Sequence, residues 1–308
     1  MKPSSYAHTY SIVAIDADAG EMGVAVQSHY FSVGSVVPWA RAGVGVVATQ
    51  ALVNAHFGPE GLALLAAGRT PQEALTELTE ADEGSAYRQV ALLAPGFTPA
   101  THTGNTCIAE AGHATGPDYS CQANMMLTDT VWDAMARAFE GERRAGASLS
   151  QRMLAALLAA EYEGGDIRGR QSAALLIVKT ESTGSEVDDR VLDLRVEDHH
   201  NPLTELERLL SVHRAYRHAD AGDAAMESGD IEEALARFRA AEELQPDNLE
   251  LRYWHGVNLL SAGRTDEGIG ILGEVVQRNR NWLELTLRLP DAGLAEFDGE
   301  TLQRLKKL

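Results

Sequence analysis

The chain has 308 residues, 44% of them hydrophobic and 23% charged, a composition typical of a folded protein and not of a disordered one. Acidic residues outnumber basic ones by 45 to 26, and the net charge of −19 argues against nucleic acid or an anionic membrane surface as a partner. The sequence has neither the apolar core of a signal peptide nor a membrane span of roughly 18 apolar residues, so we expect a cytoplasmic protein that does not bind membranes.

The N-terminal part of the chain is dominated by β-branched and small apolar residues. It predicts a hairpin of strands over 9–16 and 22–29 with a turn at 17–21, followed by strands over 30–39 and 42–50. These runs are almost continuously apolar, which is typical of strands buried on both faces. We therefore expect a sheet that is covered on both sides.

After this segment the hydrophobic period changes to that of helices. A helix that begins at Gly58 is broken at 68–71, and a second helix is expected over 72–81. The remaining predicted elements are strands over 87–94 and 107–111, a polar loop over 112–124, helices over 129–141 and 148–162, a buried strand over 172–178 and an edge strand over 191–196.

The order of these elements predicts a leader over 1–8, an α+β layered domain over 9–200 and a third part over 201–308. The third part has no strand pattern and contains two segments that are similar at a spacing of 34 residues, which predicts a small all-α tetratricopeptide-like domain. It is expected either to support the first domain or to bind a protein partner. The matching positions are Gly222, Gly229, Ala234, Phe238, Ala241 and Pro246, and Gly256, Gly263, Gly268, Leu272, Val275 and Arg280.

Thr9, at the head of the first predicted strand, is a candidate catalytic nucleophile. If residues 1–8 were removed, its hydroxyl could attack a substrate while its own α-amine served as the base, because an α-amine titrates near pH ~8. The alternative is a threonine that only packs at the start of a strand.

The loop over 164–172 contains a second pair of candidates, Asp166 and Arg168. The carboxylate could orient the amine of the nucleophile, and the guanidinium could bind a substrate carboxylate through two hydrogen bonds. The alternative is an internal Asp–Arg pair that holds the loop in place.

Several motifs of the first domain resemble an uncharacterised bacterial and archaeal family, domain of unknown function 1028, which is placed in the N-terminal-nucleophile (Ntn) hydrolase superfamily. The motifs are the hairpin, SHYFSVGSVVP at 28–38, GVVATQA at 45–51 and GGDIRGRQSAA at 164–174, and the resemblance extends over about residues 9–210. It implies a four-layer αββα sandwich in which Thr9 occupies the position of the nucleophile.

The resemblance also implies roles for residues near Thr9. His29 is expected to tune the nucleophile, since histidine titrates near neutral pH, unless it is simply exposed at the end of a strand. Asn124 is expected to donate to an oxyanion, with a helix cap as the alternative. Four residues of these motifs are expected to bind the substrate: Ser28, Thr49, Arg168 and Gln171.

The resulting hypothesis is an Ntn-type amidohydrolase that cleaves a small amide or peptide bond after removal of the leader. The alternative is an unprocessed, non-catalytic protein of the same fold that binds a ligand or acts as a scaffold. We also expect a homodimer and a protein partner that binds residues 201–308. The sequence predicts no cofactor and no metal, because the spacing of His102, Cys107, His113 and Cys121 matches no zinc site.

Overall fold

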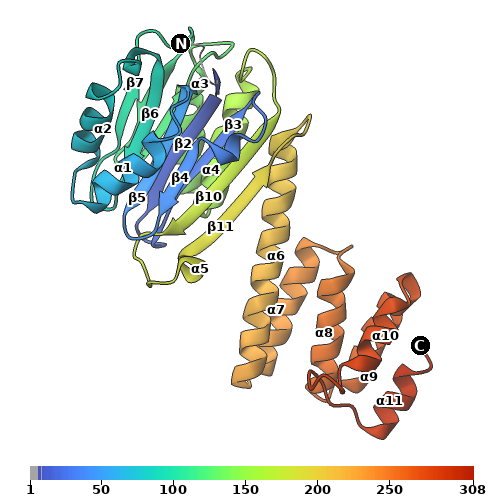
Figure 1. Ribbon diagram of the computed structural model, residues 1–308. Coiled ribbons are helices and arrows are strands. Elements are labelled where there is room, and N and C mark those ends of the chain that lie inside the picture. Colours follow the sequence, from blue (N-terminus) through green and yellow to red (C-terminus); the bar gives the residue numbers. More distant parts are fainter. Residues whose placement is uncertain (1–5, 8) are drawn as a thin grey trace. The chain divides into compact units, whose positions relative to one another are not determined.

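The computed structural model describes residues 6, 7 and 9–308, which form two compact units, Met1–Glu207 and Arg208–Leu308 (Figure 1). Most of the predicted leader therefore lies outside the described residues. The first unit contains two antiparallel sheets with helices, and the second is entirely helical. The first domain is thus of the α+β kind that the order of elements predicts.

The six-stranded sheet has β2 near its centre. Its strand order is β11-β10-β3-β2-β9-β8, and each neighbouring pair is antiparallel. Thr9 opens β2 and lies opposite Ser28 of β3. The strands are β2 (Thr9–Asp16), β3 (Glu21–Ser28), β8 (Gly112–Thr115), β9 (Tyr119–Ala123), β10 (Ser172–Lys179) and β11 (Arg190–Val196).

The five-stranded sheet is built around β5. The strands β1 and β4 pair with different parts of β5 on one side, and β6 followed by β7 lies on the other side. Its strands are β1 (Tyr6–Ala7), β4 (Pro38–Arg41), β5 (Gly45–Leu52), β6 (Arg88–Leu93) and β7 (Ala100–Thr103).

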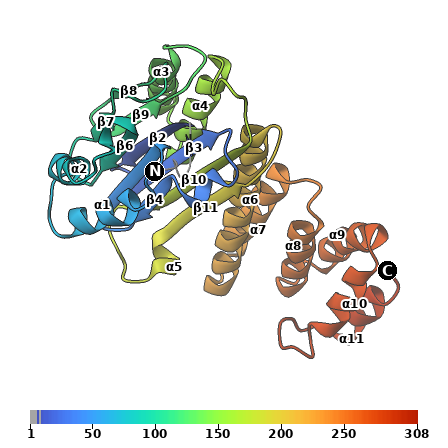
Figure 2. The same cartoon turned by 45° about the horizontal axis from the view of Figure 1, so that its top comes forward.

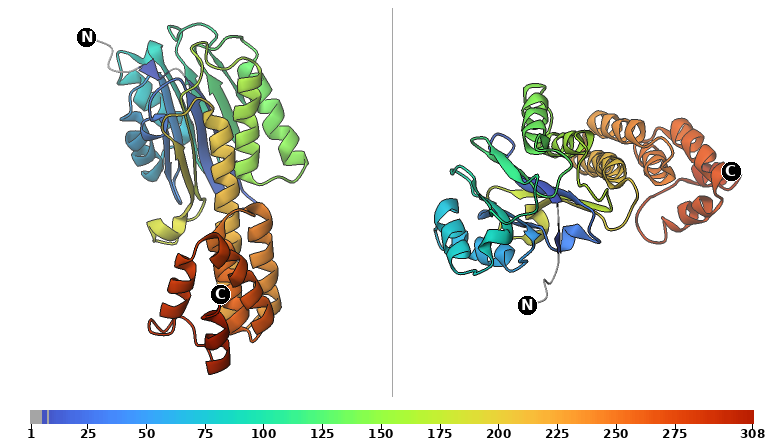
Figure 3. Two further views of the ribbon diagram at one scale, coloured as in Figure 1. Left: turned by 90° about the vertical axis from the view of Figure 1, so that its right-hand side faces the viewer. Right: turned by 90° about the horizontal axis from the view of Figure 1, so that it is seen from above.

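Helices cover the outer faces of both sheets, and the inner faces share one apolar core (Figure 3). The strand period of two directs Val24 and Val26 of β3 to the same interior as Val46 and Ala48 of β5. The helices α1 (Phe57–Ala66) and α2 (Pro71–Glu80) pack on the five-stranded sheet, and α3 (Val131–Arg144) and α4 (Leu149–Tyr162) pack on the six-stranded sheet. Short helical turns are η1 (Val33–Ser35), η2 (Ser85–Tyr87) and α5 (Glu186–Asp189).

Two predictions in this domain are wrong. Residues 30–37 form no strand, because Ser32 adopts a left-handed conformation with φ of 57° and starts the turn η1. Residues 107–111 also form no strand, and the predicted loop at 112–124 instead contains β8 and β9. The sequence pattern hides β9, since its inward-facing residues Ser120 and Gln122 are polar although both are fully buried.

The helix α6 (Pro202–Ser228) begins in the first unit and continues into the second. The second unit also contains α7 (Ile231–Leu244), α8 (Leu249–Ser261), α9 (Thr265–Arg278), α10 (Asn281–Arg288) and α11 (Gly299–Leu305) (Figure 2). The helix α6 includes Gly222. A Cβ atom at Gly222 would stand 2.6 Å from the ring of Phe238, so the missing side chain allows α6 and α7 to approach closely. In the described part of the chain, none of the helices has both the length and the apolar character needed to cross a bilayer.

Candidate functional site

The start of β2 is surrounded by buried amide donors. Thr9 is fully buried, and its carbonyl oxygen accepts hydrogen bonds from the backbone nitrogen of Asn124 at 3.1 Å and from its Nδ2 at 3.3 Å. Nε2 of Gln50, which comes from the other sheet, donates to the same oxygen at 3.2 Å. Both sheets therefore hold the Thr9 backbone in place.

A network of side-chain amides continues from this point between the two sheets. Nε2 of Gln50 donates to Oε1 of Gln89 at 2.7 Å, and the hydroxyl of Ser11 donates to Oε1 of Gln50 at 2.6 Å. Gln122 donates in turn to the Ser11 hydroxyl at 2.6 Å. All four side chains are fully buried, and a buried amide is stable only when its hydrogen-bonding groups are paired. The network therefore fixes the positions of the groups around Thr9.

Asn124 connects Thr9 to this network. Its Nδ2 donates at 2.9 Å to Oε1 of Gln89 as well as to the Thr9 carbonyl. The alternative interpretation of Asn124 as a helix cap is wrong, because α3 begins at Val131 and Thr130 is its N-cap residue. Asn124 thus presents an amide donor beside the candidate nucleophile.

Asp166 lies across the end of the sheet at which β2 begins. Its backbone forms a bridge with Met126, which follows β9, and its carboxylate accepts a hydrogen bond at 3.2 Å from the backbone nitrogen of His29, which follows β3. Because β2 runs between β3 and β9, Asp166 is bonded to the segments that follow both neighbours of β2. The sequence hypothesis placed Asp166 near the hairpin, and the structure brings the two together.

The direction of the Thr9 backbone indicates which side of the strand its nitrogen faces. In an antiparallel strand the N–H and C=O of one residue point toward the same neighbour. The Thr9 carbonyl is bonded to Asn124, so the Thr9 nitrogen also faces the segment that follows β9. Asp166 pairs with that same segment through Met126.

Arg168 forms a two-pronged ion pair with Asp166. Its Nε and Nη2 lie 3.0 and 2.7 Å from the two carboxylate oxygens, and its backbone nitrogen donates to Oδ1 at 2.9 Å. The Asp166 side chain is completely buried, whereas the Arg168 side chain is 30% exposed. This geometry corresponds to the internal pair that the sequence left open as an alternative.

The other predicted site residues are less close to the network. The ring of His29 is at the surface, and Nε2 of Gln171 donates to Asp198 at 3.2 Å. The Thr49 hydroxyl donates to the carbonyl of Asn54 at 3.1 Å. Alternate residues of a strand share a face, so Thr49 lies on the helix-covered face of β5 together with Val47, and its neighbour Gln50 lies on the inner face. Ser28 remains beside Thr9 as its cross-strand neighbour.

Sequence reasoning missed the three glutamines Gln50, Gln89 and Gln122. For Gln50 and Gln89 a usable signal existed, since each is a polar residue at an inward position of an otherwise apolar strand, and such a residue needs a buried partner. Only the pairing of the two sheets shows that the partners are one another.

The potential metal ligands each have a separate environment. His102 bonds to a backbone carbonyl, the Cys107 thiol donates to another, His113 bonds to a threonine hydroxyl and Cys121 is fully buried. Burial raises the pKa of the Cys121 thiol, which keeps it protonated. Among the described residues, no group of three or more such side chains is arranged to hold a metal ion.

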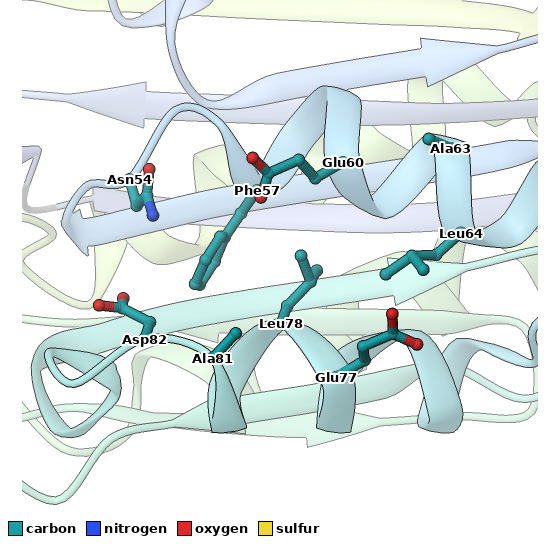
Figure 4. Close-up of a pocket in the computed structure, with 9 residues that line it drawn as sticks. All are labelled: Asn54, Phe57, Glu60, Ala63, Leu64, Glu77, Leu78, Ala81 and Asp82. Carbon is teal, nitrogen blue, oxygen red and sulfur yellow. The ribbon is translucent and has the colours of Figure 1, made fainter.

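Cavities of similar size open on the described part of the first unit. One, of about 520 Å³, lies between α1 and α2 and has Phe57 and Leu78 in its floor and Glu60, Glu77 and Asp82 around it (Figure 4). The other, of about 540 Å³, is lined by residues of β4, β10 and β11. Thr9 lines neither of these cavities and is fully buried.

Gln27 is a buried amide on the opposite, helix-facing side of β3. Its Oε1 and Nε2 have no hydrogen-bond partner in the described part of the chain, while its neighbour Tyr10 donates to Glu161 at 2.7 Å. Burial, reinforced by the Glu161 carboxylate, raises the pKa of Tyr10 well above its usual value and keeps this hydroxyl a donor.

Replacing Gln27 by methionine is expected to stabilise the protein. Methionine has a similar volume and has no amide to leave unpaired, so the free energy of unfolding should rise by about 1–2 kcal/mol. Urea unfolding measures the change, and the exposed Gln72→Met on α2 is the matched control. A loss of stability in Gln27→Met would mean that the amide has a partner, such as an ordered water.

Comparisons with known proteins identify both units. Residues 9–206 match the "Family of unknown function (DUF1028)" and residues 225–287 match a tetratricopeptide repeat, a class of helical repeat that suggests binding to other proteins. A crystal structure of the protein SPO2555 from Silicibacter pomeroyi, described as DUF1028, is 32% identical, covers 66% of this chain and 88% of its own, and has a TM-score of 0.58. No curated protein matches.

Proposed function

The chain belongs to the DUF1028 family, a family of unknown function, and we propose that it is an amide hydrolase of the Ntn kind whose nucleophile is Thr9. The observation that carries this proposal is the position of Thr9 at the head of a central strand, with Asp166 across the end of that strand and Asn124 beside it. Cleavage between residues 8 and 9 would free the α-amine of Thr9.

The freed amine supplies the base of the proposed reaction. It takes the proton of the Thr9 hydroxyl as Oγ1 attacks the substrate carbonyl, and the tetrahedral intermediate collapses when the leaving amine accepts that proton. Water then attacks the resulting ester in the same way and releases the acid. One threonine therefore performs both the acylation and the hydrolysis.

Asn124 supplies the donor for the oxyanion. Nδ2 of Asn124 makes two hydrogen bonds. In the longer one, 3.3 Å to the Thr9 carbonyl, the oxyanion would take the place of that carbonyl as the acceptor. The other, 2.9 Å to Gln89, keeps the amide oriented. Removal of one donor of this kind lowers the rate of such enzymes by about 10²–10³.

Asp166 acts in this proposal as a positioning residue for the amine. The Thr9 nitrogen faces the segment to which Asp166 is bonded, and Arg168 holds the carboxylate rigid. The guanidinium is occupied by this pair, so the earlier assignment of Arg168 to a substrate carboxylate is not part of the proposal.

The proposal includes the four-layer αββα arrangement of Ntn hydrolases. Its support is the pair α1 and α2 on the outer face of one sheet, the pair α3 and α4 on the outer face of the other, and the shared core between the sheets. In this arrangement the head of β2 lies between two layers, where a hydroxyl can be shielded from water.

A second candidate function is favoured by one observation. Thr9 is fully buried in the intact chain, which would suit an unprocessed, non-catalytic member of the same fold that acts through binding. The two candidates differ in whether residues 1–8 remain attached.

The mass of the intact protein, purified from its own host, distinguishes them. The hydrolase proposal expects a chain that begins at Thr9, and a Thr9→Ala variant expressed in the same host should keep its leader if the cleavage is autocatalytic. A wild-type protein that retains residues 1–8 under every growth condition favours the binding candidate.

A further inference from the structure

We propose that the edge of β5 at Ala51–Leu52 binds the acyl side of the substrate, and that the substrate is therefore an extended peptide and not a compact amide. This inference rests on the proposed function and names the substrate class of the same site. It starts from β1, the pair of residues that precedes the proposed cleavage point.

The strand β1 shows where the chain before Thr9 lies. Tyr6 pairs with Leu52 and Ala7 pairs with Ala51 in antiparallel register, so β1 belongs to the five-stranded sheet. Thr9 already belongs to the six-stranded sheet, where it lies opposite Ser28. The described residues on the two sides of the proposed cleavage point therefore belong to different sheets.

This path indicates the direction from which a substrate enters. In cleavage before Thr9, residues 1–8 are the acyl side of the bond and the hydroxyl attacks the carbonyl of residue 8. A later substrate is attacked by the same hydroxyl, so its carbonyl must occupy the same place. The group attached to that carbonyl then follows the path of β1 along β5.

The structure leaves this edge open once β1 departs. The strand β4 pairs with Gly45–Ala48 of β5 and stops there, so among the residues that the structure describes, β1 is the strand that pairs with Ala51 and Leu52 on that side. The opposite side of β5 is held by β6 as far as Ala51, and the carbonyl of Leu52 accepts a hydrogen bond from Arg88. The edge therefore keeps its shape without β1.

The backbone at this edge is unusual. Ala51 has a φ of 70°, in the left-handed region that residues other than glycine rarely adopt. Strained positions of this kind concentrate at binding and catalytic sites because the surrounding structure must hold them there. Its cross-strand partners are Ala7 on one side and Arg88 on the other.

An exposed strand edge recognises the main chain of its ligand. Its free N–H and C=O groups pair with those of an added strand, so affinity depends on backbone amides and not on one side chain. The ligand expected here has at least two amino-acid residues before the scissile carbonyl. Ureides and simple amides lack that backbone.

The leader peptide is the probe for this edge. The experiment uses a chain with two changes: a site-specific protease sequence directly before residue 9, and Thr9→Val to prevent turnover. This chain is folded at full length and then cut. The peptide MKPSSYAH, with an amidated end, is titrated by calorimetry. A twin with N-methyl groups on the amides of residues 6 and 7 is the control, since it keeps every side chain and loses two backbone donors.

The expected result is that the leader peptide binds the cut protein and that the N-methylated twin binds at least about 10-fold more weakly. The uncut protein should bind neither peptide, because its own β1 occupies the edge. Equal affinity for the two peptides, or no binding of either one, would overturn the inference. Thermal unfolding of the cut form checks that it remains folded.

A second measurement does not depend on a cut protein. In the intact chain, hydrogen exchange of the amides at 51–52 should become faster in Ala7→Pro, which cannot donate from residue 7, and unchanged exchange there would also overturn the inference. This test and the test of the proposed function can fail separately. Peptide binding without leader removal in the host contradicts the hydrolase proposal alone. Leader removal without peptide binding contradicts the β5 subsite alone.

Discussion

Replacing Gln89 by leucine is expected to lower the free energy of unfolding by about 3–5 kcal/mol, because one side chain satisfies several buried groups. Its Oε1 accepts from Gln50 and Asn124, and its Nε2 donates to the carbonyls of Gly112 and Ala123 and to the Thr103 hydroxyl. Leucine fills a similar volume but leaves these partners unpaired.

Urea unfolding followed by circular dichroism measures this loss. The matched control is Gln72→Leu on the surface of α2, where a change within about 0.5 kcal/mol is expected. If Gln89→Leu costs less than about 1 kcal/mol, the amide network is not what joins the two sheets at this end.

Replacing Thr9 by valine is expected to abolish covalent chemistry while the fold persists. Valine retains the shape of threonine and lacks only the hydroxyl, so a stability loss of no more than about 2 kcal/mol is expected at this fully buried position. In a chain that begins at residue 9, acylation by an electrophilic β-lactone should fall by at least about 10³-fold, since loss of a nucleophile removes nearly all covalent catalysis.

Mass spectrometry of the modified protein measures the rate and the position of that acylation. Thr9→Ser is the control that keeps a hydroxyl and should still be labelled. Labelling of Thr9→Val at the wild-type rate would mean that another side chain reacts.

Much of the fold could be predicted from local pattern. The apolar runs of β2, β3, β5 and β10 identified these strands because their residues are buried on both faces, as in Val13 and Leu175. The break at 68–71 separated α1 from α2. The 34-residue spacing predicted the repeat, and two of its positions, Ala234 and Phe238, belong to one buried cluster.

The parts that could not be predicted depend on contacts between distant segments. Gln122 looks like a loop residue until Ser11 of another strand is placed beside it. Arg168 looks available to a ligand until the loop folds and brings it onto Asp166. The sequence therefore named Thr9 and Asp166 as candidates, whereas the amide network beside Thr9 is visible only in three dimensions.

The most direct test of the central claim compares two cut proteins, one that begins at Thr9 and one that begins with a single glycine before Thr9. Both have the Thr9 hydroxyl, but only the first has a free α-amine on that residue. The account predicts rapid β-lactone acylation of Thr9 in the first protein and a loss of at least about 10²-fold in the second, the range expected for removal of a general base. Equal labelling of the two proteins, or labelling of neither one, would contradict it.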